Sequence, residues 1–159
     1  MRRSLFIAVA GAAALLAGAV VRAAGDEEPG EAEPPRELFD SPAAKPGGLA
    51  FDGRHLWVAD RIGGTIRGID PDSGRQVEKL PAPGPWPTGL AHDGELLWVA
   101  DKLRDRLFAI DVAKRLVVRE VPSPAGPLGL AFDGRHLWVA DGERIHQVSR
   151  EDEIGRAHV

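Results

Sequence analysis

The chain of 159 residues contains no cysteine, no tyrosine and no asparagine. Without cysteine it can form no disulfide bond and no thiolate metal site, and it has no cysteine nucleophile. An excess of basic residues is also missing, because 20 Lys and Arg stand against 24 Asp and Glu, a formal net charge of -4. Proteins that bind nucleic acids normally carry a clustered basic surface, so we predict no nucleic-acid partner.

The longest apolar run lies at the N-terminus. Arg2 and Arg3 precede the run Leu5–Val21, and Ala23 follows with a small side chain where a signal peptidase would read. This order predicts a secretory signal peptide over residues 1–23, and therefore a secreted or periplasmic protein. The run is at the short limit for a membrane span, so an uncleaved anchor is the alternative. After cleavage we expect no membrane association.

The next segment, residues 24–36, is acidic and contains three prolines but no apolar side chain larger than Ala or Pro. Such a segment cannot bury enough surface to offset the entropy lost on ordering. We predict a disordered linker here, followed by a folded region over residues 37–159.

Three segments of that region are nearly the same: Gly48–Asp60, Gly89–Asp101 and Gly129–Asp141. Each begins with Gly-Leu-Ala and ends with Leu-Trp-Val-Ala-Asp. The period is close to forty residues, which is typical of a stacked repeat architecture. The repeats are expected at about 47–87, 88–127 and 128–159. Their shared positions, predicted to be structural, are Trp57, Trp98, Trp138, Asp60, Asp101, Asp141, Gly53, Gly94 and Gly134.

Each repeat predicts four short antiparallel strands. The Asp-Gly pair in the middle of the shared segment favours a tight turn between two strands. In the first repeat the strands are expected at 48–51, 56–59, 65–69 and 76–80. In the third repeat the fourth strand would have to be Ile154–Val159, which matches its counterparts poorly. Four strands in about forty residues indicate an all-β fold, a partial β-propeller of three four-stranded blades.

The pattern of a strand, an Asp-Gly turn and then Leu-Trp-Val-Ala-Asp resembles the repeats of bacterial NHL-type and YncE-like propellers. The resemblance runs from Leu38 to about Arg150 and implies a propeller fold. It implies little about activity, because this superfamily supports unrelated functions. By their spacing from the first repeat, Leu38 and Phe39 are expected to form an outermost strand without a blade of its own.

Three blades do not close a ring, since propellers as a class have about four to eight. Two blade faces would then be open to water. Either two copies pair into a six-bladed ring, or another protein completes the ring, or the chain is a truncated product. We favour the dimer.

The recurring aspartates Asp60, Asp101 and Asp141 follow the tryptophan strand in each repeat. They could form a ring of carboxylates that holds Ca²⁺. The interpretation we favour is that each accepts hydrogen bonds from the backbone of its own loop. We therefore predict no metal and no other cofactor.

Ligand-binding candidates are residues that break the repeat or lie in the loops beside it. His92 stands where the other repeats have phenylalanine; it could be a pocket imidazole, but the interpretation we favour is a partly buried packing residue whose polar atoms find partners. In propellers of this type, the links between blades and the loops after the second strand usually form the ligand-binding face. The full set of candidates is Trp86, His92, Arg61, Lys102 and Arg104.

Enzymatic motifs are missing. Gluconolactonase-type propellers bind their metal partly through asparagine, which this chain lacks. No Gly-x-Ser-x-Gly nucleophile motif is present, and the five histidines show no compact ligand spacing. We predict an exported, non-catalytic binding or scaffold module for a protein or a small ligand. The alternatives are a hydrolase or lyase with a channel site that is active only as an oligomer, and a truncated propeller fragment.

Overall fold

The computed structural model describes residues 34–150. The chain divides into two units, Met1–Glu37 and Leu38–Val159. Of the first unit only residues 34–37 are described; they are exposed and belong to no helix or strand. The predicted signal peptide, most of the predicted linker and the expected strand Ile154–Val159 lie outside the described residues. Within the described range, no helix is long and apolar enough to cross a membrane.

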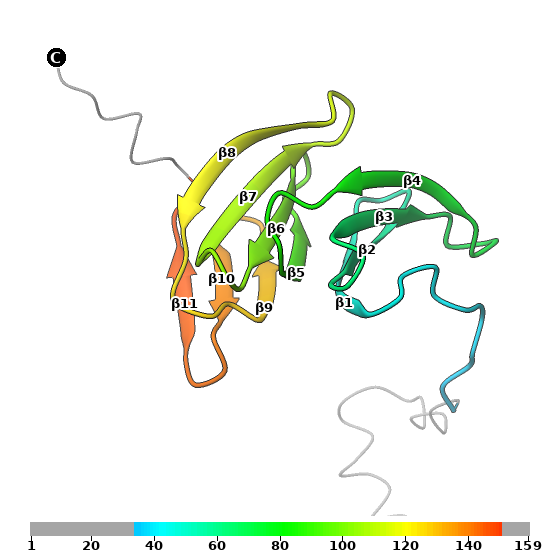
Figure 1. Cartoon of the computed structure of the whole chain (residues 1–159), viewed down its shortest axis with the longest axis horizontal. Coiled ribbons are helices and arrows are strands. Elements are labelled where there is room, and N and C mark those ends of the chain that lie inside the picture. Colours follow the sequence, from blue (N-terminus) through cyan, green and yellow to red (C-terminus); the bar gives the residue numbers. More distant parts are fainter. Residues whose placement is uncertain (1–33, 151–159) are drawn as a thin grey trace, which may run out of the picture. The chain divides into compact units, whose positions relative to one another are not determined.

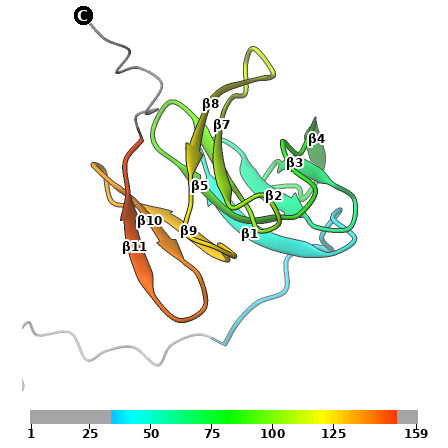
Figure 2. The same ribbon diagram turned by 60° about the vertical axis from the view of Figure 1, so that its left-hand side comes forward.

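The second unit consists of three antiparallel sheets, which we call blades 1, 2 and 3 (Figure 1, Figure 2). Blade 1 contains β1 (Pro46–Phe51), β2 (Leu56–Asp60), β3 (Thr65–Ile69) and β4 (Gln76–Pro81). Blade 2 contains β5 (Pro87–His92), β6 (Leu97–Asp101), β7 (Arg106–Asp111) and β8 (Leu116–Pro122). Blade 3 contains β9 (Gly129–Phe132), β10 (Leu137–Ala140) and β11 (Ile145–Val148). The predicted all-β fold is confirmed, and the sheets have 4, 4 and 3 strands within the described residues.

The Asp-Gly pairs form the tight turns between the first two strands of each blade. Gly53, Gly94 and Gly134 have φ values of 94°, 97° and 96°, in the region that side chains rarely adopt. The strands that they join pair directly, so that in blade 1 Ala50 lies opposite Trp57 and Phe51 opposite Leu56.

Each blade has two different faces. In the cluster between blades 1 and 2, the side that carries Trp57 and Ile66 packs against the side of blade 2 that carries Leu97 and Val99. We call these the tryptophan face and the valine face. The tryptophan face of blade 2 packs in the same way against the valine face of blade 3, which carries Val139. The core therefore lies between consecutive blades, as expected when no single repeat can bury its own apolar surface.

The inner strands β1, β5 and β9 approach one another through glycine. A β-carbon placed on Gly48 would lie 2.5 Å from the carbonyl oxygen of Thr88 and from the amide nitrogen of Leu90. A β-carbon on Gly89 would lie 2.7 Å from the amide nitrogen of Leu130. At these two positions only glycine lets the next blade come so close. At the equivalent Gly129, the nearest atom is in blade 3 itself, 3.6 Å away.

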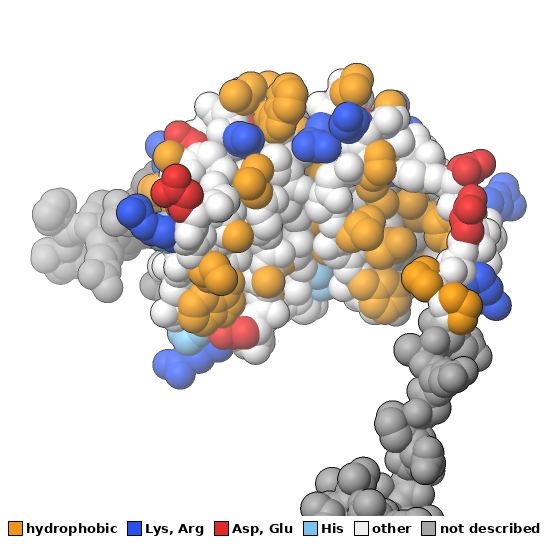
Figure 3. Space-filling view, turned by 90° about the horizontal axis from the view of Figure 1, so that it is seen from below, with side chains coloured by type: hydrophobic (Ala, Val, Ile, Leu, Met, Phe, Trp, Pro, Cys, Tyr) orange, Lys and Arg blue, Asp and Glu red, His pale blue; other side chains and the backbone are white. Residues whose placement is uncertain are grey.

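The two outer faces of the described arc are open. Trp57 and Trp98 are fully buried, whereas Trp138, which occupies the same position in blade 3, is 37% exposed. On the valine face of blade 1, Leu49 is 57% exposed and Phe51 is 55% exposed. Figure 3 shows hydrophobic side chains gathered on the right-hand part of one surface, which is the side of blade 1.

The expectation that Leu38 and Phe39 form a strand is wrong. These residues belong to no strand, because no neighbouring strand of the described chain offers its edge to them. Phe39 instead packs with Ala43 against Val58 and Ile69 on the valine face of blade 1. Val58 and Ile69 correspond to Val99 and Ile110 of blade 2, which β4 covers through Leu80 and its neighbours. Phe39 thus takes the place of an outer strand without pairing as one.

Candidate functional site

The aspartate that ends β2 is fully buried and accepts four hydrogen bonds. Asp60 Oδ1 accepts from the amides of Lys45 and Gly63, and Oδ2 accepts from the amide of Ala44 and from Arg67 Nη2, at 3.0 to 3.2 Å. Burial raises the pKa of this carboxyl, but the hydrogen bonds outweigh it and lower the pKa to about 2. With its lone pairs occupied, Asp60 fixes the loop after β2 to the segment before β1.

The equivalent aspartates have similar partners. Asp101 accepts from the amides of Trp86, Leu103 and Arg104. Asp141 accepts from the amides that follow it and, through Oδ2, pairs with His146 Nε2 at 2.8 Å. Among residues 34–150, no group of three or more His, Asp or Glu side chains is placed to hold a metal ion. The recurring carboxylates therefore lie in separate loops, each engaged by its own backbone.

A second recurring aspartate, at the Asp-Gly turn, has a role that the sequence analysis missed. Asp52 Oδ1 accepts from the amides of Arg54 and His55, and Oδ2 accepts from Trp57 Nε1 at 2.7 Å. Burial raises the pKa of Asp52, but the hydrogen bonds outweigh it and lower the pKa to about 2. In the other blades, Asp93 and Asp133 hold the indoles of Trp98 and Trp138 in the same way. An aspartate five residues before every repeated tryptophan was the available signal.

The links between blades and the loops after the second strands lie at one end of the sheets, which we call the link end. The amide of Arg61 donates to the carbonyl of Lys45, and the amide of Lys102 donates to the carbonyl of Trp86. Arg104 Nη1 donates to the carbonyl of Pro83 in the same link. Four of the five candidate residues, Arg61, Trp86, Lys102 and Arg104, are therefore at the link end.

A cavity of about 460 Å³ opens where the three inner strands begin. Among the five candidate residues, only Arg61 lines it. The other lining residues are apolar, glycine or threonine: Pro46, Gly47, Gly48, Leu49, Thr88, Gly89, Leu90, Leu128, Gly129 and Leu130. We call this space the channel cavity, because it lies at the inner strands on which the blades converge.

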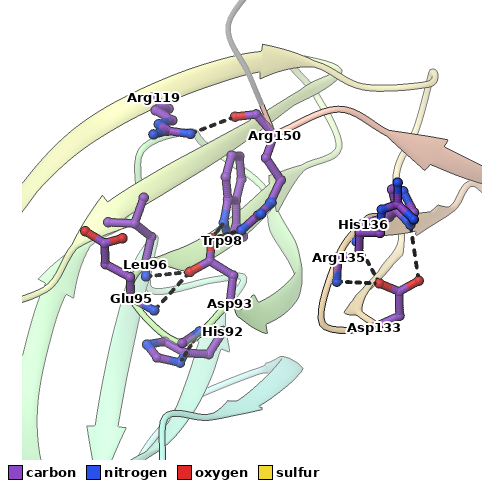
Figure 4. Close-up of polar contacts among 11 residues, drawn as sticks. His92, Asp93, Glu95, Leu96, Trp98, Arg119, Asp133, Arg135, His136 and Arg150 are labelled. Atoms are coloured by element: carbon purple, nitrogen blue, oxygen red, sulfur yellow. Dashed lines mark hydrogen bonds and ion pairs between the residues drawn. The ribbon is translucent and has the colours of Figure 1, made fainter.

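The opposite end of the sheets holds a groove of about 360 Å³ between blades 2 and 3, and Figure 4 draws several of the polar residues that line it. Two of its arginines are held by hydrogen bonds. Arg150 Nη1 donates to Asp93 Oδ2 at 3.2 Å, and Arg119 Nη1 donates to the carbonyl of Arg150 at 3.1 Å. Burial raises the pKa of Asp93, but hydrogen bonds from Leu96, Trp98 and others outweigh it and leave the pKa lowered.

His92 lies at the end of β5 near this groove and does not line the channel cavity. Its Nδ1 accepts a hydrogen bond of 3.2 Å from the amide of Gly94 (Figure 4). Because side chains alternate along a strand, His92 is on the same face of β5 as Leu90, the face toward blade 1. The structure therefore does not bring His92 together with Arg61 or the other link-end candidates.

Three described histidines lie beside aspartates: His55 with Asp52, His136 with Asp133, and His146 with Asp141. In each pair the aspartate already accepts bonds from backbone amides of its turn. Of these three histidines, only His136 lines either of the two cavities. The pairs are features of the turns, spread over two blades, and they do not converge on one pocket.

No family model matches the chain, and no curated protein sequence matches it. Several solved structures are similar in fold. Glutaminyl cyclase from Myxococcus xanthus has a TM-score of 0.63 and 23% identity, over 72% of this chain and 50% of that one. Hydrazine synthase from Kuenenia stuttgartiensis has a TM-score of 0.59 and 17% identity, over 74% of this chain and 36% of that one.

Virginiamycin B lyase from Staphylococcus aureus has a TM-score of 0.55 and 20% identity, over 71% of this chain and 40% of that one. The chain thus spans half or less of the length of each of these proteins. At these identities the similarity is one of fold. The described part of the chain therefore has a β-propeller-type fold and forms three of its blades.

Proposed function

We propose that this chain is an exported propeller module of the NHL or YncE type that has no catalytic activity and works by binding. In particular, two copies join head to tail through their end blades and form a six-bladed ring. The observation that carries the proposal is that, within residues 34–150, blade 3 leaves open the tryptophan face that blades 1 and 2 bury. Propellers have about four to eight blades, so two arcs of three are enough for closure.

The chain's own interfaces provide the template for this contact. The tryptophan face of blade 2 packs against Leu130, Leu137 and Val139 of blade 3. The residues at these positions in blade 1 are Leu49, Leu56 and Val58. In the proposed dimer, the face of blade 3 that carries Trp138 packs against this surface of the second copy. A contact between two different patches closes into a ring when its rotation is right.

The glycines of the inner strands support the same arrangement. Gly48 and Gly89 are in positions where the backbone of the next blade leaves no room for a β-carbon. Gly129 occupies the equivalent position, although nothing in the described chain requires glycine there. A second copy, docked as blade 2 docks on blade 1, would bring its own Gly47–Leu49 backbone against Gly129.

The outer part of the contact is also complementary. Blade 3 has three strands within the described residues, so β11 is an edge strand. The segment with Phe39 packs on the valine face of blade 1. It lies there in the same way as β4 lies on the valine face of blade 2. In the dimer this segment would lie next to β11 of the other copy, where an extended chain can add to the open edge of a sheet.

The test is the solution mass of the purified chain, measured by light scattering over a concentration series. We expect a mass of two chains, and we expect Gly129→Ala to raise the dimer dissociation constant at least about tenfold by blocking the close approach. Phe51→Glu should act similarly from the opposite end face. A monomer at all concentrations, or a dimer indifferent to both changes, would refute the proposal.

Mixing the two variants gives a further check on the head-to-tail geometry. In a mixed pair, the unaltered blade 1 of the Gly129→Ala chain meets the unaltered blade 3 of the Phe51→Glu chain. One of the two contacts is then intact, so the mixture should dimerise more strongly than either variant alone. A contact that joins two copies of the same face would show no such recovery.

A further inference from the structure

Among the residues that the structure describes, Arg61 is the one charged residue that lines the channel cavity. Its Nε is buried and has no hydrogen-bond partner, and within residues 34–150 no acceptor is bonded to its guanidinium. Arg67 Nε is buried without a partner too, but the Nη1 and Nη2 atoms of Arg67 bond to Gln76 and Asp60, so in the described chain its guanidinium is held by acceptors as that of Arg61 is not. A buried polar group without a partner costs free energy and calls for an explanation.

The side chain of Arg61 is held in position by its surroundings. Its amide donates to the carbonyl of Lys45, which fixes the start of the loop. Its Cγ and Cδ run beside Gly47 and would lie 3.4 and 3.5 Å from a β-carbon at that position. Because Gly47 has no side chain, the arginine can lie along the backbone at the mouth of the cavity. The equivalent residues of the other repeats are Lys102 and Gly142, so the propeller repeat itself does not require arginine here.

The rest of the lining suits an apolar group with few polar contacts. Leu49, Leu90, Leu128 and Leu130 contribute aliphatic side chains. Thr88 is not a free donor, because its hydroxyl donates to the carbonyl of Pro127 at 2.8 Å. The inner strands β1, β5 and β9 are edge strands of their sheets, and backbone groups on such an edge have no strand partner. Over the described range 34–150, no carboxylate lines the cavity and competes for Arg61.

We infer that the channel cavity binds a small organic carboxylate with an aliphatic body. The carboxylate accepts charge-assisted hydrogen bonds from the Arg61 guanidinium, whose planar fork matches its two oxygens. The aliphatic part lies against the leucines of the inner strands. The volume of about 460 Å³ is within the range of small-molecule sites. This site lies within a single chain and does not depend on the proposed dimer.

The test is a titration of the ¹⁵N-labelled chain with hexanoate, followed by the amide signals of Gly47, Gly48, Gly89 and Gly129. Hexan-1-ol has the same chain length without the charge, and inorganic phosphate has charge without the aliphatic body. We expect saturable shifts at these glycines with hexanoate, and binding at least tenfold weaker with hexan-1-ol and with phosphate. If phosphate binds as tightly as hexanoate, the aliphatic part of the assignment is overturned. If hexan-1-ol binds as tightly as hexanoate, the ionic part is overturned.

Two variants test whether the hexanoate-induced amide shifts depend on Arg61. Arg61→Gln should weaken hexanoate binding at least tenfold while leaving the urea midpoint of unfolding unchanged. Arg54→Gln removes an exposed arginine at the opposite end of blade 1 and should leave binding as it was. If Arg61→Gln binds hexanoate like the unaltered chain, the inference fails.

The Phe51→Glu variant separates this inference from the proposed dimer. It should still bind hexanoate as a monomer, because Phe51 does not line the cavity. Loss of binding in the monomer would overturn the assignment of the site to a single chain.

Discussion

The central tryptophan gives the sharpest test of how the blades stabilise one another. Trp98 is fully buried and packs in one cluster with Leu137 and Val139 of the next blade. Replacing a buried Trp with Ala removes its transfer free energy and leaves a cavity, at a cost of about 3–5 kcal/mol. Asp93 Oδ2 would lose the indole donor but keep the bond from Arg150, so the carboxylate is not left unpaired.

Trp138→Ala is the matched control, because Trp138 has the same position, strand and aspartate partner in blade 3. Its ring is 37% exposed and faces no further blade of the described chain. Water fills the space, so no cavity remains and we expect a loss of only about 1–2 kcal/mol. The measurement is urea unfolding by far-UV circular dichroism, at a concentration where light scattering gives one chain.

The total stability of such a domain is about 5–15 kcal/mol, so Trp98→Ala could leave too little folded protein to measure. Trp98→Phe retains much of the ring and should give a smaller loss that is still measurable. If Trp98→Ala and Trp138→Ala lower the free energy of unfolding by equal amounts, packing against blade 3 adds no stability to the tryptophan face of blade 2. The interpretation of stacked blades would then be refuted.

Three further predictions use the same unfolding measurement. Gly48→Ala should lower the free energy of unfolding by about 1–3 kcal/mol, because the new β-carbon would meet the backbone of blade 2 at 2.5 Å. Gly129→Ala in the monomer should leave the free energy of unfolding nearly unchanged, since no backbone of another blade lies near it in the described chain. Equal effects of the two changes would contradict the close approach. Gly94→Ala should cost about 1–2 kcal/mol although there is open space around it, because φ is 97°; an unchanged urea midpoint would count against a strained turn. The pKa of Asp60 is lowered from 3.8 to about 2. The ionised carboxylate therefore adds about 2 kcal/mol to the free energy of unfolding above pH 4, and this stabilisation is lost as the pH falls through about 2. Asp60→Asn should therefore reduce the difference in unfolding free energy between pH 5 and pH 2, and an unchanged difference would show that Asp60 is not responsible.

Much of the fold could be predicted because each repeat carries its own local signals. The Asp-Gly pairs mark turns, and Leu-Trp-Val-Ala marks strands buried on both sides, so the predicted strands agree with the observed ones to within a residue or two. The failure at Leu38 and Phe39 is instructive. Their spacing from the first repeat was informative about position, since Phe39 does cover blade 1. A strand also needs a partner edge, which spacing within one chain does not reveal.

The candidate site was harder to predict, because it depends on which ends of the strands come together. The sequence places Arg61 in the loop after the second strand and His92 at a position that breaks the repeat, yet the two residues lie near opposite ends of the sheets. The channel cavity is formed by small and apolar residues from three repeats, such as Gly47, Leu90 and Leu128. Each of these residues looks like ordinary core, so a site assembled from their backbones gives no local signal.

The segments Gly48–Asp60 and Gly129–Asp141 are identical residue for residue, yet within residues 34–150 the first has a neighbouring blade on its tryptophan face and the second has one on its valine face. One molecule thus contains the same hairpin in two environments, with local propensity, turn chemistry and hydrogen-bonding side chains held constant. Any difference in amide exchange between the two hairpins therefore compares what a neighbouring blade on the tryptophan face contributes to local stability with what a neighbouring blade on the valine face contributes. The two hairpins thus serve as internal controls for each other in an amide-exchange measurement. A partner that covers the tryptophan face of the second hairpin would slow amide exchange in that hairpin.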